Sequence, residues 1–241
     1  MIDPGRALLA LERATAEVPV LLAGADLGAA VPACPGWTVT DLVVHLGKVH
    51  VWAEQCIRLG NPKERDLPGP GRGAAALAGW YRHCADLLLE TLRSTSPDQP
   101  CWTFGPPPRE ASFWFRRQAH EAAVHRWDLG TALGRDLGYP SELAADGVGE
   151  VVTIFFPRQV RLQRIPPLTR SLAVAVDGGP TWVLHGDGTG EPAGVPDAVV
   201  TGPVEALVLL LWGRLALDDP GLSVTGSREA AVAVLSAGIV P

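Results

Sequence analysis

The chain has 241 residues, 47% of them hydrophobic, so it can build a real core in one large domain or two modest ones. Its 20 basic and 26 acidic residues give a formal net charge of -6 without a local cluster of Lys and Arg, which argues against nucleic-acid binding. The four cysteines are widely spaced and form no CxxC pair, which disfavours a zinc ribbon and predicts reduced thiols in a cytoplasmic protein.

The N-terminal segment does not look like a targeting signal. It reads MIDPGRALLALERAT, with an acidic residue near its start and no basic segment followed by an apolar one. The longest apolar run, ALVLLLWG, is far shorter than the about 20 residues that cross a bilayer. We therefore expect neither a signal peptide nor a membrane-spanning helix, and no membrane partner.

The first part of the chain has apolar residues at helical spacing in four blocks, at residues 4–24, 38–59, 73–95 and 109–134. Segments rich in Pro and Gly, such as VPACPGW and SPDQPCWTFGPPP, separate the blocks. Thr38 begins the second block, and Asp41 follows Thr38 by three residues, which is the spacing of a capping box. Four helices of this length predict a four-helix bundle.

The bundle should end near Pro140, and a further helix over 141–162 should lead out of it. After Pro167 the sequence changes to short β-rich runs, which read SLAVAVDG, TWVLHGDG, DAVVTG and LSVTG. Helical patterns at 203–217 and 227–237 lie between and after these runs.

These patterns predict an α+β protein. We expect a helical domain at residues 1–160 and a smaller α+β domain at residues 165–241.

The fourth predicted helix contains the stretch QAHEAAVHRWDLG. Glu121 and His125 are four residues apart and share a helix face, whereas His120 lies roughly 140° around the helix from His125 and cannot easily share an ion with it. If a metal binds here, Glu121 and His125 are ligands and a third comes from elsewhere. The alternative is a metal-free ion-pair ladder, because Arg117 lies one turn before Glu121.

The second predicted helix offers the third ligand. His45 lies on its apolar stripe with Leu42, Val49 and Trp52, so it should face the bundle core. A buried imidazole needs a partner, which can be a backbone or carboxylate oxygen or a metal ion. Because bundle cores commonly hold metals between facing helices, the two helices together favour a metal site more than either does alone.

Asp128 follows His125 by three residues. It either orients a ligand histidine through its second ring nitrogen or is an ordinary cap or surface acid. The remaining histidines and the four cysteines are interpreted as core or surface residues. Several tryptophans either line a ligand pocket or simply pack in the core; they are Trp37, Trp52, Trp102, Trp114 and Trp127.

Three segments resemble the mycothiol-dependent maleylpyruvate isomerase family: CPGWTVTDLVVHL, the Glu121–His125 pair with the RWD that follows it, and LLLWGRLAL. The resemblance covers nearly the whole chain and implies a DinB-like metal-binding bundle followed by a sterol-carrier-like α+β domain. It implies that His45, Glu121 and His125 hold a divalent metal, which in this family is usually taken to be zinc. It also implies a role for Arg214 in catalysis, although this arginine could instead cap the late helix.

Two imidazoles and a carboxylate leave a fourth zinc position open, as in catalytic sites, and a thiol bound there loses its proton. The resemblance thus implies a metal-bound thiolate, from mycothiol or another low-molecular-weight thiol, that attacks a small electrophile. The enzyme would be an isomerase if the sulfur leaves again after rotation about the attacked bond, or an S-transferase if it stays. The alternative is a metal-free or non-catalytic member of the fold that binds a small molecule or regulates a partner.

Overall fold

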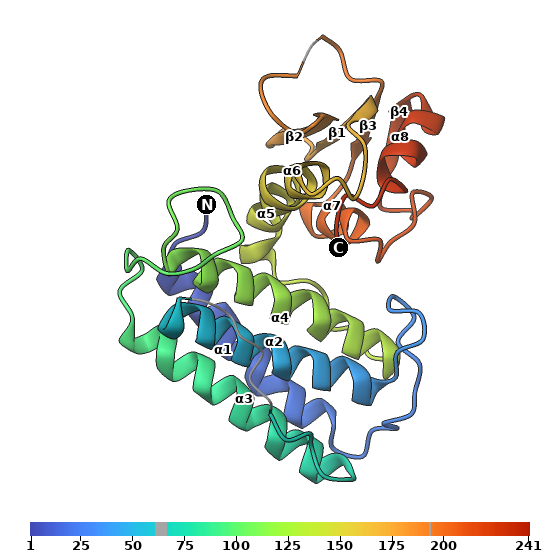
Figure 1. Ribbon diagram of the computed structural model, residues 1–241. Coiled ribbons are helices and arrows are strands. Elements are labelled where there is room, and N and C mark those ends of the chain that lie inside the picture. The colour runs from blue at the N-terminus through green and yellow to red at the C-terminus, as the bar shows by residue number, and fades with distance from the viewer. Residues whose placement is uncertain (61–66, 193) are drawn as a thin grey trace. The chain divides into compact units, whose positions relative to one another are not determined.

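The computed structural model describes residues 1–60, 67–192 and 194–241, and the contacts within it divide the chain into two compact units (Figure 1). One unit spans residues 2–139, and the other spans residues 140–241 together with Met1. The first domain was expected to extend to residue 160. Residues 140–160 instead make their contacts mainly within the second unit.

The first unit contains four long helices, which confirms the predicted helical blocks. They are α1 (Pro4–Leu21), α2 (Val39–Leu59), α3 (Ala74–Ser94) and α4 (Ser112–Ala132). Helix α1 packs against α3 and α4, and α2 packs against the same two helices. The helices that carry the candidate ligands, α2 and α4, are therefore neighbours.

The helix starts follow local capping rules. The side chain of Asp3 accepts a hydrogen bond from the backbone N–H of Arg6 and caps α1. Thr38 caps α2 through the predicted capping box: its hydroxyl accepts from the N–H of Asp41, and the Asp41 carboxylate accepts from the N–H of Thr38 at 2.9 Å. This box fixes the start of α2 two turns before His45.

Buried apolar side chains from the four helices, among them Leu42, Leu46 and Tyr81, form the core of the bundle. Gly47 lies where α2 approaches α3, and a Cβ atom there would come within 2.4 Å of Cζ3 of Trp80. The glycine therefore allows the two helices to come close, with the indole filling the space above it.

The second unit begins with a continuous helical segment, as predicted over 141–162. It consists of α5 (Ser141–Glu150), a π-helical turn η1 (Val151–Phe155) and α6 (Phe156–Arg161). In the π turn the N–H of Phe156 bonds to the carbonyl of Val151, five residues back. Pro157 follows at once, and since proline lacks an N–H and its ring crowds the preceding turn, the local widening has a structural cause.

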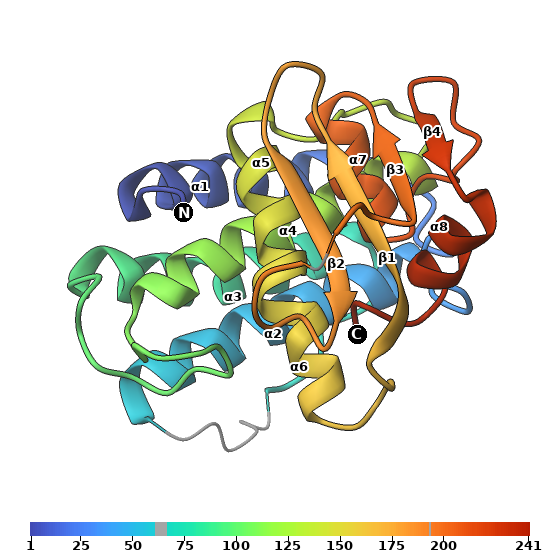
Figure 2. The ribbon, with the colours of Figure 1, turned by 90° about the horizontal axis from the view of Figure 1, so that it is seen from above.

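A four-stranded sheet forms the centre of the second unit, with the order β2-β1-β3-β4 (Figure 2). The strands are β1 (Leu168–Ala175), β2 (Thr181–Gly186), β3 (Ala198–Thr201) and β4 (Ser223–Gly226). Strand β1 is antiparallel to β2 and parallel to β3, and β3 is antiparallel to β4. Leu172, Ala173 and Val174 are consecutive and all buried, so both faces of β1 are covered.

Two further helices, α7 (Val204–Leu211) and α8 (Arg228–Leu235), pack against β1 and complete the α+β fold that was predicted. The helix expected at 203–217 is shorter than predicted, because α7 ends at Leu211. Gly213 adopts φ +70° and donates to the carbonyl of Leu210, while the N–H of Arg214 donates to the carbonyl of Leu209. This pair of bonds is a Schellman motif, which ends α7 just before Arg214.

Within the described residues, the helices are too short or too polar to cross a bilayer.

Candidate metal centre

The structure brings the three predicted ligands together where α2 and α4 run side by side. The Nε2 atom of His45 lies 3.2 Å from Oε1 of Glu121, and Nε2 of His125 lies 3.4 Å from the same oxygen. Ligand atoms of all three residues lie within 4.8 Å of one another. Because a tetrahedral ion with bonds of about 2.1 Å holds its ligand atoms about 3.4 Å apart, the cluster fits one divalent cation with little movement.

The three side chains differ in exposure. His125 is 11% exposed and Glu121 is 16% exposed, whereas His45 is 36% exposed. The expectation that His45 faces the interior of the bundle was therefore wrong in part, since its ring lies at the edge of the α2–α4 seam. This position leaves one side of the cluster accessible.

Glu121 is held in its ionised form. Its Oε2 atom accepts a hydrogen bond from Nη2 of Arg117 at 2.7 Å, and the Arg117 side chain is almost fully buried. Burial raises the pKa of Glu121, but hydrogen bonds with His125 and His45 and the charges of His125 and Arg117 outweigh it, so the pKa lies well below the ordinary value. The structure therefore contains both the Arg117–Glu121 ion pair, which the metal-free alternative predicts, and the close approach of the three candidate ligands.

His125 is oriented by Asp128, which is fully buried. The Nδ1 atom of His125 lies 2.9 Å from Oδ2 of Asp128, while Nε2 faces Glu121. Burial lowers the pKa of His125, but the hydrogen bonds with Asp128 and Glu121 outweigh it and raise the pKa to about 9. Of the two interpretations of Asp128, the structure favours the one in which it orients the ring.

The loop before α2 contributes two residues to the cluster, Trp37, which was named as a possible pocket residue, and Cys34, which sequence reasoning missed. The Sγ atom of Cys34 lies 3.8 Å from Oδ2 of Asp128, although this cysteine was interpreted as an ordinary core residue. The ring of Trp37 lies 4.8 Å from that of His45 and 6.4 Å from that of His125, measured between centroids. The available signal was the CPGW turn immediately before the Thr38 cap, which has to lie close to the first turns of α2.

The other tryptophans named above do not all gather at this cluster. Trp52, Trp102 and Trp114 pack against one another, with Trp52 at 5.8 Å from Trp102 and 5.1 Å from Trp114 between ring centroids. The indole N–H of Trp114 donates to the carbonyl of Trp102 at 2.7 Å. This aromatic cluster lies two helical turns from His45 along α2 and two turns from Glu121 along α4.

Two other histidines of the bundle are core residues. His50 is fully buried, with Nδ1 2.7 Å from Oε1 of Gln118 and Nε2 3.2 Å from the hydroxyl of Tyr81. Burial lowers the pKa of His50 to about 4, so its ring is neutral near pH 7. His120 is also fully buried and contacts the hydroxyl of Tyr139. Both agree with the interpretation of these histidines as non-ligands.

Arg214 lies in the second unit. Its Nη1 atom donates to the carbonyl of Trp212 at 2.7 Å, and its guanidinium carbon lies 5.9 Å from the centroid of the Trp212 ring. A bond to a carbonyl at the end of α7 is the contact expected if Arg214 caps the helix. The role in catalysis stays a prediction.

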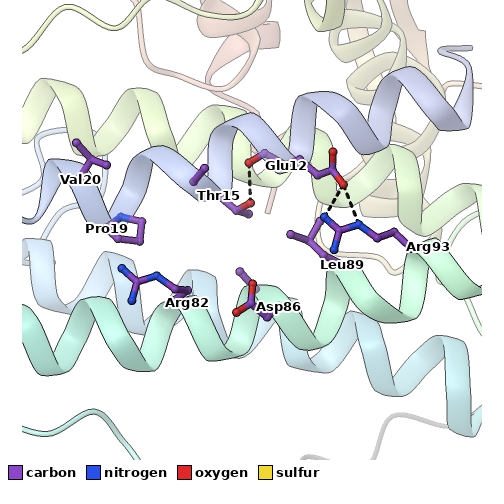
Figure 3. A pocket seen from close by; sticks show the side chains of 10 residues that line it. Glu12, Thr15, Pro19, Val20, Arg82, Asp86, Leu89 and Arg93 are labelled. Atoms are coloured by element: carbon purple, nitrogen blue, oxygen red, sulfur yellow. Dashed lines mark hydrogen bonds and ion pairs between the residues drawn. The ribbon is translucent and has the colours of Figure 1, made fainter.

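A groove of about 420 Å³ lies between α1 and α3 (Figure 3). Its wall includes Arg93, which donates two hydrogen bonds to Oε1 of Glu12. Arg82 and Asp86 line the same groove. The candidate ligands lie on the other two helices, so this groove is separate from the cluster.

Comparison with known proteins identifies the family. The profile of the "Mycothiol maleylpyruvate isomerase N-terminal domain" matches residues 8–130, and that of the "MDMPI C-terminal domain" matches residues 142–233. The fold is similar to the crystal structure of mycothiol-dependent maleylpyruvate isomerase, with a TM-score of 0.66, and to that of a histidine-to-alanine mutant of it, with a TM-score of 0.68. In both cases the identity is 16%, and 93% of each chain is covered.

A search of curated proteins finds no significant match. The two profile matches together span nearly all of both units, and they agree with the resemblance noted in the sequence. The chain therefore belongs to the mycothiol maleylpyruvate isomerase family.

Proposed function

We propose that this protein is a divalent-metal-dependent enzyme, an isomerase or an S-transferase, in which the sulfur of a low-molecular-weight thiol of the mycothiol type attacks a small electrophile. One observation carries the proposal: His45, Glu121 and His125 converge with spacings of 3.2 and 3.4 Å around one carboxylate oxygen. The names of the family and of the similar structures support the choice of thiol and reaction type.

The residues present fit a metal on chemical grounds. Two imidazole nitrogens and one carboxylate oxygen form a donor set used by catalytic zinc, and the far nitrogen of His125 is held by the buried Asp128 carboxylate, as ligand imidazoles require. A bound divalent cation would supply an open position at which a thiol loses its proton at neutral pH.

The buried charges around the cluster favour an anionic sulfur. Arg117 contributes one positive charge, and Glu121 and Asp128 each contribute one negative charge, so these three residues sum to one negative charge. A divalent cation would leave one positive charge in a poorly solvated place, which an anionic ligand neutralises and a neutral one does not. The positive charge of Arg117 thus makes the metal-loaded site favour an anionic thiolate over a neutral thiol.

The two proposed reactions share their first step. The sulfur forms a C–S bond to one carbon of a conjugated double bond, and the electron pair moves onto the conjugated carbonyl. In an isomerisation the chain rotates about the resulting single bond, the C–S bond breaks and the double bond re-forms. In an S-transfer a proton adds instead, and the sulfur stays attached. Arg214 would hold a substrate carboxylate through its planar guanidinium, which a lysine could not match.

The proposal is tested by a turnover assay on zinc-loaded protein with a low-molecular-weight thiol and a panel of conjugated cis-enoic acids, ketones and epoxides, followed by NMR. We expect turnover that requires both metal and thiol and that is lost in Glu121→Gln. Glu90→Gln, at an exposed position of α3, is the matched control and should behave as wild type. Turnover that persists without thiol, or in Glu121→Gln, would contradict the proposal.

A second candidate function is a non-catalytic member of the fold that binds a small molecule or regulates a partner. The observation in its favour is that the Glu121 carboxylate pairs with Arg117 and lies within 3.4 Å of a ring nitrogen of each of the two histidines. In that case the purified protein should contain no metal and show no turnover, while small ligands still raise its melting temperature.

A further inference from the structure

A second group of potential metal ligands adjoins the proposed centre. Cys34, Asp128 and His125 offer atoms that all lie within 4.8 Å of one another. We propose that Cys34 Sγ, Asp128 Oδ2 and Nδ1 of His125 form a second divalent-cation site for a thiophilic ion such as zinc. It rests on the proposed function only in sharing His125, since it uses the other ring nitrogen and needs neither His45 nor Glu121.

The distances suit such an ion. Bonds of about 2.3 Å to sulfur and about 2.1 Å to oxygen and nitrogen place sulfur about 3.6 Å from oxygen, and nitrogen about 3.4 Å from oxygen, around a tetrahedral centre. The observed separations are 3.8 Å between Sγ and Oδ2 and 2.9 Å between Nδ1 and Oδ2. The sulfur–oxygen separation is thus close to the required value, and the His125 ring and the Asp128 carboxylate would have to move apart by about 0.5 Å.

The donor types select the ion. A thiolate with an imidazole and a carboxylate suits zinc and cobalt and disfavours magnesium and calcium, which prefer oxygen ligands alone. Asp128 is a fully buried carboxylate that accepts hydrogen bonds from the Cys34 thiol and the His125 ring. An ion would replace both of these interactions, and the thiol proton and the Nδ1 proton would pass to solvent. With both sites filled, the Nε2 proton would leave as well, and His125 would bridge the two ions as an imidazolate.

The loop that carries Cys34 is already ordered. The N–H of Cys34 donates to the carbonyl of Val31, the N–H of Trp37 donates to the carbonyl of Cys34, and the N–H of Val31 donates to the carbonyl of Trp37. Because the turn is closed by these bonds, little conformational entropy is lost when the thiol becomes a ligand. An ion in the second site would tie this turn, and with it Trp37, to α4.

Cobalt titration followed by absorption spectroscopy tests the inference, because a charge-transfer band in the near ultraviolet arises only when a thiolate binds the ion. We expect wild-type protein to bind two equivalents of cobalt, one of which produces this band. Cys34→Ala should lose the band and the equivalent of cobalt that produces it. His45→Ala should keep the band and lose the equivalent of cobalt that produces none. Cys101→Ala, a partly buried cysteine of the same unit, is the matched control and should retain both.

Each outcome decides between the two sites. If cobalt binds in a His45-dependent way without a charge-transfer band, the second site is rejected and the proposed function stands. If the band appears and depends on Cys34 while His45→Ala binds as much cobalt as wild type, the second site stands and the proposed centre fails. A band that survives in Cys34→Ala rejects the second site. If Cys34→Ala does not fold, the rate at which an alkylating reagent modifies Cys34 of the wild-type protein is measured with and without zinc. Slower modification with zinc supports the second site, and equal rates reject it.

Discussion

The two units bury different kinds of side chain. In the described part of the second unit the buried polar side chains are Glu150 and Gln159, and α7 buries an unbroken apolar run. In the first unit α4 alone buries five polar or charged side chains: Arg116, Arg117, Gln118, His120 and Asp128. Burying such groups costs free energy unless each is paired, so the polar interior of α4 distinguishes the helix that carries the candidate site.

The largest difference between the units should appear when one arginine is neutralised. Arg117→Met should destabilise the metal-free protein by about 3 kcal/mol, because it removes the buried guanidinium that pairs with the Glu121 carboxylate. Saturating zinc should recover part of the loss, since the ion then neutralises Glu121. Urea unfolding with and without zinc measures both effects.

The control lies in the second unit. Arg170 pairs with Asp197 at 3.1 Å on the surface, so Arg170→Met should change stability little. Equal losses in the two variants would break the contrast between the units.

The next largest effect is the pH dependence of stability that a buried histidine of the first unit contributes. The pKa of His50 is about 4 in the folded protein against 6.5 for an unperturbed imidazole, so between these values the unfolded chain binds the proton and the folded chain does not. Stability should therefore fall as pH falls from about 6.5 to about 4, with a contribution from His50 of about 3 kcal/mol in total. His50→Gln should remove this part of the pH dependence.

Urea unfolding of wild type and His50→Gln across that range measures the difference. His83→Gln, at an exposed position of α3, is the control and should follow wild type. A pH dependence in His50→Gln as steep as that of wild type would show that the buried imidazole does not contribute.

The smallest effect should be equal in the two units, because helix caps act locally. Thr38 caps α2 and Ser227 caps α8, each by accepting a bond from a backbone N–H of the first turn. Thr38→Ala and Ser227→Ala should each cost about 1 kcal/mol. If Thr38→Ala is folded but no longer binds metal, the capping box also positions His45.

The sequence predicted what depends on local pattern. Glu121 and His125 were recognisable as a pair because four residues make one helical turn, and Thr38 was recognisable as a cap from its spacing to Asp41. The edge position of His45 depends on how α2 meets its neighbours, which periodicity does not contain.

The errors have physical reasons too. Cys34 lies 94 residues from Asp128 in the chain, so no local pattern connects them. The apolar run around Arg214 continues past Gly213, but the left-handed backbone at that glycine ends α7. Tertiary packing and single backbone positions, rather than composition, decide these features.

Zinc calorimetry on wild-type protein and on His125→Ala, both stripped of metal first, tests the central claim most directly. We predict tight zinc binding by wild type and none of comparable affinity by His125→Ala, with unchanged helix content by circular dichroism. If His125→Ala binds as much zinc as wild type with the same affinity, or if wild type binds none, His45, Glu121 and His125 do not form a metal centre.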